Sequence, residues 1–349
     1  MRLKRMGWWR RWLSLIPATF FIALGLYALW PWLPFTAKAA PTRTIVFYGF
    51  SITGDAMNRG IFPAFQNKWE TETGERVEFI SAFGSSGTVT NQLIMGVPAE
   101  VALLALELDA QRLADAGVIA ANSWQALPNQ GVVNRSPFII LVRPGNPLAI
   151  HDFADLTQPG VRIVHPDPLT SGAANWSVVA EYGAGVDANP GNPNAGYEML
   201  LGIWRNVVAQ ASSARAARTQ FENGFGDVLI TYEQDVLRDV ANGRLPAEII
   251  TPSSTIFSEH TLVVLDKNID SEERPVVDAF VAFLWSEEAQ QIFADYGFRS
   301  VDEAINASNP LFGTVRQPRF IADFGGWSQA KPEIIEAIWK NQVLKELDQ

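Results

Sequence analysis

The segment VEFISAFGSSGTVTNQLIM, residues 77–95, contains the pattern that decides the fold. Val77–Ser81 is predicted as a β-strand, and Gly87–Met95 is predicted as a helix. Between them lies Phe83-Gly84-Ser85-Ser86-Gly87-Thr88, a loop of mostly small and hydroxyl-bearing residues. A strand that enters a helix through such a short loop is the building unit of α/β folds.

The same alternation continues on both sides of this segment. Further strands are predicted at Thr44–Tyr48, Val101–Leu106, Phe138–Val142, Arg162–Val164, Asp227–Thr231 and Leu262–Asp266. Further helices are predicted at Met57–Glu72, Ala110–Ala116, Ala173–Gly183, Gln234–Ala241, Pro275–Trp285 and Glu287–Tyr296. Asp187–Asn194 is interpreted as a loop, because proline and glycine interrupt regular structure. The alternation predicts an α/β fold whose sheets are mostly parallel and flanked by helices.

Composition excludes several classes of protein. The length of 349 residues suits two domains or one large one. With 48% apolar and 18% charged residues, the chain is not disordered. It has no cysteine, which excludes disulfides, thiolate metal sites, a cysteine nucleophile and a lipoprotein anchor. His151, His165 and His260 are too widely spaced for a metal-binding motif, so no metal and no cofactor is predicted.

Charge is distributed unevenly along the chain. Residues 1–40 hold six of the 27 basic residues and none of the 37 acidic ones. Residues 41–349 therefore carry 21 basic and 37 acidic residues, a net charge of −16. Non-specific binding of nucleic acid requires a basic face, so no nucleic-acid partner is predicted.

The N-terminus has the features of an export segment. A basic start precedes an uncharged run over 12–36, and Ala37-Lys38-Ala39 fits a cleavage site before Ala40. Residues 1–39 are therefore predicted to be a signal peptide. The run is also close to the roughly 20 residues that span a bilayer, so a retained anchor over residues 13–35 stays open. Both alternatives place residues 41–349 outside the cytoplasm, in the periplasm or its equivalent.

Two loops favour binding of an anion over catalysis. The chain contains no GxSxG, GxxxxGK[ST] or GxGxxG motif, and no catalytic residue is predicted. By contrast, 83–88 and Pro168-Leu169-Thr170-Ser171-Gly172-Ala173 each join a predicted strand to a predicted helix. Small residues there leave N–H groups at a helix N-terminus open to an oxyanion, which the helix dipole attracts. Ordinary capping by serine and threonine is the alternative explanation for each loop.

Around these loops the sequence resembles the sulfate/thiosulfate-binding proteins of ABC importers, over roughly residues 44–345. The resemblance rests on an ordered set of motifs, which are Ser85-Ser86-Gly87, Ala102–Leu106 with Asp109, Phe138–Pro147, Pro166–Pro168 with Thr170–Ala173 and Trp176, Gly226–Ile230, and Phe324–Trp327. It implies the two-lobed periplasmic-binding-protein fold of type II. Lobe 1 is expected at 42–136 plus 254–349 and lobe 2 at 137–253.

The resemblance also implies a set of ligand-binding residues. In that family, backbone amides, serine hydroxyls and an indole N–H hold a fully ionised tetrahedral anion without a countercharge. The corresponding positions in this chain are Ile52, Ser86, Ser171, Gly172, Ala173, Ala214 and Tyr232. Tyr232 replaces the family's tryptophan, and Ala173 replaces a second glycine. These differences fall at the ligand, so anion binding is implied more strongly than sulfate itself.

Three charged residues bear on the choice of anion. Arg218 is expected to be a surface charge. Glu107, at the end of a buried strand, and Asp55 would repel sulfate and favour a protonated oxyanion if they entered the cleft. A site with donors alone rejects a protonated anion, because the proton then has no acceptor.

The predicted function is capture of sulfate or thiosulfate outside the cytoplasm and its delivery to an ABC permease in the membrane. The protein is expected to be a monomer and not an enzyme. Three alternatives stay open, namely the same fold binding phosphate, molybdate or a small carboxylate, a membrane-tethered anion sensor, and an enzyme acting on a sulfate or phosphate ester.

Overall fold

The computed structural model describes residues 42–348, together with Leu24, Gly25 and Tyr27. Residues 42–348 belong to one compact unit. The predicted export segment 1–39 thus lies outside the described residues, apart from those three. Among the helices that the structure describes, none combines the length and apolar character needed to cross a membrane.

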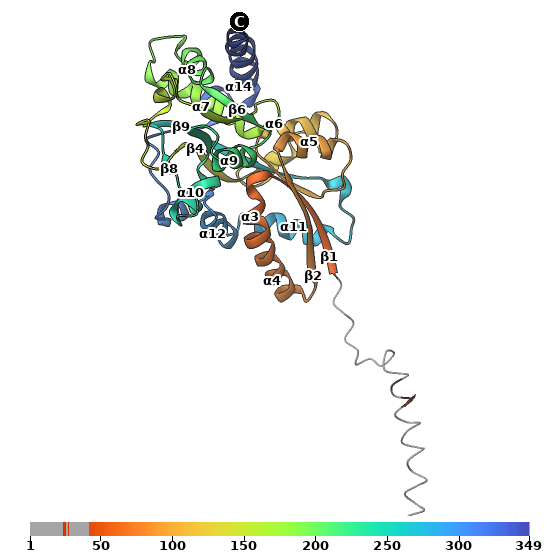
Figure 1. Cartoon of the computed structure of the whole chain (residues 1–349). Helices are drawn as coiled ribbons and strands as arrows, with labels where there is room; N and C mark the ends of the chain where they lie inside the picture. The colour runs from red at the N-terminus through yellow and green to blue at the C-terminus, as the bar shows by residue number, and fades with distance from the viewer. Residues whose placement is uncertain (1–23, 26, 28–41, 349) are drawn as a thin grey trace, which may run out of the picture. The chain divides into compact units, whose positions relative to one another are not determined.

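A mixed β-sheet runs through the compact unit (Figure 1). Its main strand order is β2-β1-β3-β9-β4-β7-β5-β6, with β8, β10 and β11 attached at its sides. The strands are β1 (Thr42–Phe50), β2 (Arg76–Gly84), β3 (Val101–Leu104), β4 (Val132–Val142), β5 (Ile163–Pro166), β6 (Val207–Ala211), β7 (Val228–Tyr232), β8 (Glu248–Ile250), β9 (Ser254–Val264), β10 (Arg299–Ser300) and β11 (Gln317–Arg319).

Two parallel groups of strands make up the ends of this sheet. In the first wing, which we define as β1, β2 and β3, β1 pairs in parallel with the other two. In the second wing, defined as β5, β6 and β7, β5 pairs in parallel with the other two. The wings are joined by β4, whose residues 132–137 pair with β9 and whose residues 138–142 pair with β7. Parallel pairing within each wing confirms the predicted α/β class.

Helices flank both wings. They are α3 (Gly54–Ala56), α4 (Phe62–Thr73), α5 (Ser86–Ile94), α6 (Glu107–Asp115), α7 (Gly172–Ala188), α8 (Ala195–Trp204), α9 (Ala214–Glu222), α10 (Glu233–Ala241), α11 (Arg274–Phe283), α12 (Glu287–Asp295) and α13 (Glu303–Ser308). The consecutive segments α14 (Trp327–Ala330), η9 (Lys331–Val343) and α15 (Leu344–Leu347) form a C-terminal helix. Short helical turns, η2 (Ser51–Thr53) and η3 (Met57–Ile61), lead from β1 into α4.

The packing around α7 explains an element that the sequence did not reveal. α7 is buried on nearly all sides, because α8, β9 and the C-terminal helix surround it. Close approach of α8 requires Gly196, where a side chain would collide with the ring of Tyr182. Gly196 and Gly202 make the α8 segment a weak helix former in isolation. Tertiary packing therefore stabilises a helix that local propensity disfavours.

Candidate functional site

The first candidate loop joins β2 to α5. Ser85 is the N-cap of α5, and its hydroxyl accepts a hydrogen bond from the Thr88 amide at 3.3 Å. The Ser85 carbonyl accepts the first helical bond, from the Val89 amide at 2.9 Å. The amides of Ser86 and Gly87 precede this bond and have no acceptor within the helix. The loop therefore directs two N–H groups out of the helix end.

The hydroxyl of Ser86 is held by groups of its own wing. It donates to the Asp109 carboxylate and accepts from the Ala105 amide, at 3.1 Å between Oγ and N. Asp109 lies in the first turns of α6 and is buried. Burial raises the pKa of Asp109, while the hydrogen bond from Ser86 and the Arg112 guanidinium, 3.1 Å away, oppose the shift. Ser86 thus satisfies a buried carboxylate.

The second candidate loop joins β5 to α7 and is held differently. The Asp167 carbonyl accepts from the amides of Thr170 and Ser171, at 3.1 and 2.8 Å. Ser171 is the N-cap of α7, yet its hydroxyl makes no capping bond to the helix. Gly172 and Ala173 supply the first amides of α7 and are buried with Ser171. This helix end therefore carries donors that no side chain caps.

The two loops come together in space. A Cβ atom at Gly87 would lie 3.1 Å from the carbonyl oxygen of Thr170, and one at Gly172 would lie 2.9 Å from Ala105 Cβ. The Trp176 indole also donates to the Ala105 carbonyl at 2.7 Å. A cavity of about 320 Å³ lies at this junction, lined by Gly87, Asp109, Ser171 and Gly172, with Arg112 and Lys331 among its cationic residues.

Tyr232 ends β7 and is fully buried among aromatic rings. Its ring lies 4.6 Å from that of Phe138 and 5.6 Å from that of His260, between centroids. Its hydroxyl has no hydrogen-bond partner in the described part of the chain. Burial raises the pKa of Tyr232 well above its usual value, and the charges of Asp235 and Asp109 raise it further. Buried hydroxyls are normally paired, so an unpaired one points to a missing partner such as water or a ligand.

Ile52 and Ala214 lie on a further pair of neighbouring elements. Ile52 is the middle residue of η2, and Ala214 is the first residue of α9 after the capping Ser213. The two elements are in contact, and both residues are buried. Ile52 is also joined to the start of α10, where the Gln234 side chain donates to its carbonyl at 3.4 Å.

The predicted residues therefore fall into two groups. Ser86, Ser171, Gly172 and Ala173 belong to the two serine loops, and Ser171 and Gly172 line the cavity at their junction. Ile52 and Ala214 lie instead on the contacting elements η2 and α9. Tyr232 links the groups, since both Asp109 and Asp235 act electrostatically on its hydroxyl. Their role in binding a ligand stays a prediction.

Two acidic residues near this site were not predicted as part of it. Asp109 appeared in the sequence only as part of a motif, and Asp235 had no recognisable signal. Both oxygens of the buried Asp235 carboxylate lack a hydrogen bond among the described residues. Its nearest charged neighbours are Arg215 at 3.4 Å and Arg218 at 3.7 Å.

The structure places all three charged residues that the sequence singled out. The expectation of a surface position for Arg218 is wrong, because its side chain is only 9% exposed and joins α9 to Asp239 of α10. Glu107 turns away from the serine loops and accepts from the side chains of Trp124 and Gln125. Asp55 is exposed and lies 3.9 Å from Arg59.

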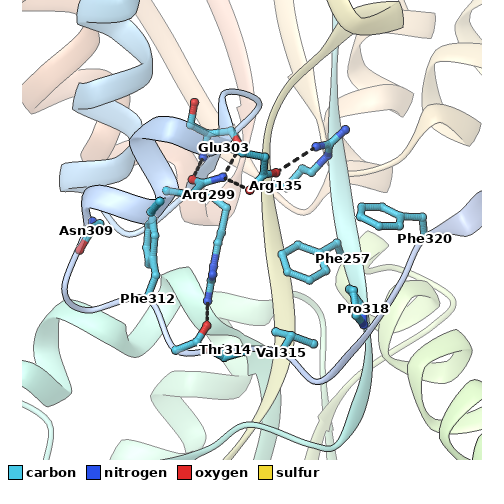
Figure 2. Close-up of a pocket in the computed structure, with 14 residues that line it drawn as sticks. Arg135, Phe257, Arg299, Glu303, Asn309, Phe312, Thr314, Val315, Pro318 and Phe320 are labelled. Carbon is cyan, nitrogen blue, oxygen red and sulfur yellow. Dashed lines mark hydrogen bonds and ion pairs between the residues drawn. The ribbon is translucent and has the colours of Figure 1, made fainter.

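Another cavity, of about 650 Å³, contains none of the predicted ligand-binding residues (Figure 2). It lies against β4, β9 and β10, where Arg299 stands 4.5 Å from the ring of Phe312 and Arg135 stands 5.5 Å from that of Phe320. Glu233 pairs with Arg299 and Glu259 pairs with Arg135, so carboxylates of the protein already bind both guanidinium groups. Volume alone therefore does not identify the oxyanion site. Within the described residues, no group of three or more acidic or histidine side chains could hold a metal ion.

Comparison with known proteins points to one class. A model of the bacterial extracellular solute-binding proteins matches residues 53–299. A sulfate-binding protein of Synechococcus elongatus is 34% identical over 86% of both chains. A thiosulfate-binding protein of Pseudomonas aeruginosa is 33% identical over 67% of this chain and 71% of its own. The structure of the sulfate-binding protein SubI from Mycobacterium tuberculosis matches with a TM-score of 0.76 at 31% identity, covering 83% of this chain and 99% of SubI.

Proposed function

The chain belongs to the bacterial extracellular solute-binding proteins, in the family of the sulfate- and thiosulfate-binding proteins, and on this premise we propose that it captures one of these anions for an ABC importer. The observation that carries the proposal is the meeting of two helix N-termini at Gly87 and Thr170. Helix N-termini attract anions through unpaired N–H groups and the helix dipole. Two of them at one junction provide donors from opposite sides of a tetrahedral ion.

The unpaired Tyr232 hydroxyl supports the same site. A phenol O–H donates one hydrogen bond, as the indole N–H of the family's tryptophan does. The ligand shell proposed here consists of Ser86, Ser171, Tyr232 and the amides of Ile52, Gly172, Ala173 and Ala214. In this proposal a bound anion replaces Asp109 as the acceptor for the Ser86 hydroxyl, or Ser86 contributes only its amide.

Two lobes would close on the anion. Except for the C-terminal helix, we keep the predicted bounds, 42–136 with 254–349 for lobe 1 and 137–253 for lobe 2. The passage of β4 between the wings after Pro137 supports them. The C-terminal helix, however, packs on α7 and α8, so we propose that residues 327–347 move with lobe 2. Closure would be read by a membrane permease.

The remaining assignments follow from this role. We propose that the protein acts as a monomer in the periplasm or outside the cell, after export directed by residues 1–39. It performs no chemistry on the anion in this role. A phosphate-type ligand is the second candidate, favoured by the Asp109 carboxylate that lines the cavity, since such a group can accept the proton of hydrogen phosphate.

Calorimetric titration of the anion-free protein with sulfate, thiosulfate, phosphate and molybdate tests the proposal. We expect one-to-one binding of sulfate or thiosulfate and no heat from phosphate. Tyr232→Phe should weaken that binding by about 1.5–3 kcal/mol, the value of a hydrogen bond to a charged group. Tyr197→Phe is the matched control, because Tyr197 lies on α8 and its hydroxyl bonds Glu346 instead. Tight phosphate binding would favour the second candidate, and silence from all four anions would refute both.

A further inference from the structure

A third cavity, of about 150 Å³, is lined by Arg215, which follows Ala214 in the chain, and by Gln234, whose side chain donates to the Ile52 carbonyl. Five arginines line it, a set that we call the arginine cluster: Arg59, Arg215, Arg218, Arg238 and Arg244. They come from three elements, η3, α9 and α10, and from the loop after α10. Figure 1 shows α3, α9 and α10 at one side of the sheet, near the middle of the molecule.

Two of these arginines are neutralised by their own neighbours. Arg218 bonds Glu222 at 2.8 Å and also Asp239, so it fastens α9 to α10. Arg244 bonds the same Asp239 carboxylate, at 2.8 Å from its Nε. Both contacts are local ion pairs, and these two side chains contribute little net charge to the cavity.

Among the described residues, the other three guanidinium groups have only two carboxylates, Asp55 and Asp235, within 4.0 Å. Arg59 is 77% exposed, and its paired carboxylate, Asp55, is 3.9 Å away. Arg238 stacks on the Tyr296 ring at 4.6 Å, and no carboxylate of the described chain lies within 4.0 Å of it. Arg215 lies 3.8 Å from Asp55 and 3.4 Å from Asp235. Asp235 is shared with Arg218, which lies 3.7 Å away.

These three arginines stand next to the proposed donors along the chain. Arg215 follows Ala214 directly, and Arg59 lies in η3, shortly after Ile52. Arg238 is on α10, which begins immediately after Tyr232. Three of the proposed donors, Ile52, Ala214 and Tyr232, are therefore followed along the chain by an arginine within seven residues. None of the three arginines is among the proposed ligand residues. In this arrangement they act on the anion through their charge and not through direct contact.

Residues 41–349 carry a net charge of −16, which repels a doubly charged anion as it approaches the protein. Distant charges are screened beyond about 8 Å at physiological ionic strength, so the sign of the nearest charges governs entry. We propose that Arg59, Arg215 and Arg238 form a cationic mouth that speeds the entry of a doubly charged oxyanion without contacting it once bound. This inference rests on the proposed function.

Stopped-flow measurement of sulfate binding by tryptophan fluorescence tests the mouth. At low ionic strength, Arg59→Gln/Arg238→Gln should bind sulfate about 10-fold more slowly than the wild type, with the dissociation rate unchanged. The difference should shrink as salt is added. Arg59→Gln alone should slow sulfate association by a smaller factor. Because Arg59 is exposed, this single variant keeps the test valid if the double variant misfolds. Arg76→Gln, exposed on β2 beside Glu70, is the control and should leave both rates unchanged.

The possible results distinguish failure of the cationic mouth from failure of the proposed anion-binding function. Equal association rates in the wild type and both variants, with sulfate still bound, would overturn the cationic mouth and leave the proposed function intact. A faster dissociation rate with unchanged association would also overturn it, because the arginines would then touch the bound ion. If the wild type binds no sulfate or thiosulfate at all, the proposed function and the mouth fail together.

Discussion

The two serine loops are built from similar sequences but use their hydroxyls in opposite ways. In the β2–α5 loop, Ser85 caps the helix and Ser86 binds the buried Asp109. In the β5–α7 loop, Ser171 occupies the cap position but makes no capping bond. The first loop is therefore stabilised by its own side chains. The second is stabilised through Asp167 and keeps its serine hydroxyl available.

The difference shows that a serine at a helix N-terminus is not by itself evidence of a ligand-binding hydroxyl. Its neighbours across the fold decide, because a buried carboxylate competes for the same hydroxyl. α6 presents Asp109 to the first loop. At the second loop the acidic Asp167 instead bonds the amide of Leu169, at 2.9 Å. We expect substitutions in the first loop to lower the stability of the protein, and substitutions in the second loop to lower its affinity for the anion.

The largest effect should come from filling the junction between the loops. Gly172→Val places a side chain where even a Cβ would be 2.9 Å from Ala105 Cβ, so the start of α7 is pushed away from the β3–α6 segment whose Ala105 amide bonds Ser86. We expect sulfate affinity to fall by about 3 kcal/mol, roughly 150-fold, measured by calorimetry. Gly191→Val is the control, since nothing lies within 4 Å of a Cβ there. Unchanged affinity in Gly172→Val would place the anion elsewhere.

Paired serine substitutions sharpen the comparison directly. Ser171→Ala should weaken sulfate binding by about 1.5–3 kcal/mol and leave the free energy of unfolding unchanged. Ser86→Ala should lower the free energy of unfolding by about 1–3 kcal/mol, because Asp109 loses a donor while buried. Urea denaturation and calorimetry of both variants give the four values. Equal losses of stability in the two variants would remove the distinction between the loops.

Only the first loop should make stability depend on pH through a buried acid. Burial raises the pKa of Asp109 in the folded chain, so the unfolded chain releases that proton at lower pH. Between the two values stability falls as pH rises, by about 1.4 kcal/mol per pH unit, whereas below the unfolded pKa it is fully present. Asp109→Asn should reduce the slope of stability against pH in urea denaturation between pH 4 and 8, while other buried acids with a raised pKa, such as Asp235, still contribute to it. Parallel curves for variant and wild type would contradict the assignment.

The smallest effect is expected at the dedicated cap. Ser85→Ala should cost about 1 kcal/mol of stability, the usual value of an N-cap, without any change in sulfate affinity. Ser286→Ala at the start of α12 offers a comparison, because its hydroxyl accepts from the Ala289 amide at 3.2 Å. A loss of affinity in Ser85→Ala but not in Ser286→Ala would show that capping and binding are coupled in the first loop.

Much of the fold could be predicted, because its strands and helices alternate with clear breaks. The predicted helix 57–72 ends before Gly74, and the structure has this glycine at φ 75° as the C-cap of α4. Other segments gave no signal. β6 contains only five residues, α8 includes two glycines, and α9 follows directly after a short turn. Such elements form through contacts with distant segments, which local patterns do not report.

The two serine loops of the candidate site could be predicted from the sequence, but their close approach in the fold could not. The contact between Gly87 and Thr170 joins residues 83 positions apart, and no local rule foresees it. The role of the Ser86 hydroxyl depends on Asp109, which lies on another helix. The burial of Arg218 depends on α10 in the same way. Residue types suggested the chemistry, while tertiary neighbours decided which groups are free.

The C-terminal helix has a consequence for the order of folding. Trp327 packs on Trp176 at 4.6 Å and Trp339 on Trp204 at 5.0 Å, between ring centroids. α7 and α8 are therefore synthesised more than a hundred residues before the helix that covers them. A ribosome-bound or truncated chain that ends before Trp327 leaves two indole surfaces exposed to water. Burial of both indoles therefore requires residues 327–339, so the packing on α7 and α8 is completed only once these residues have been made.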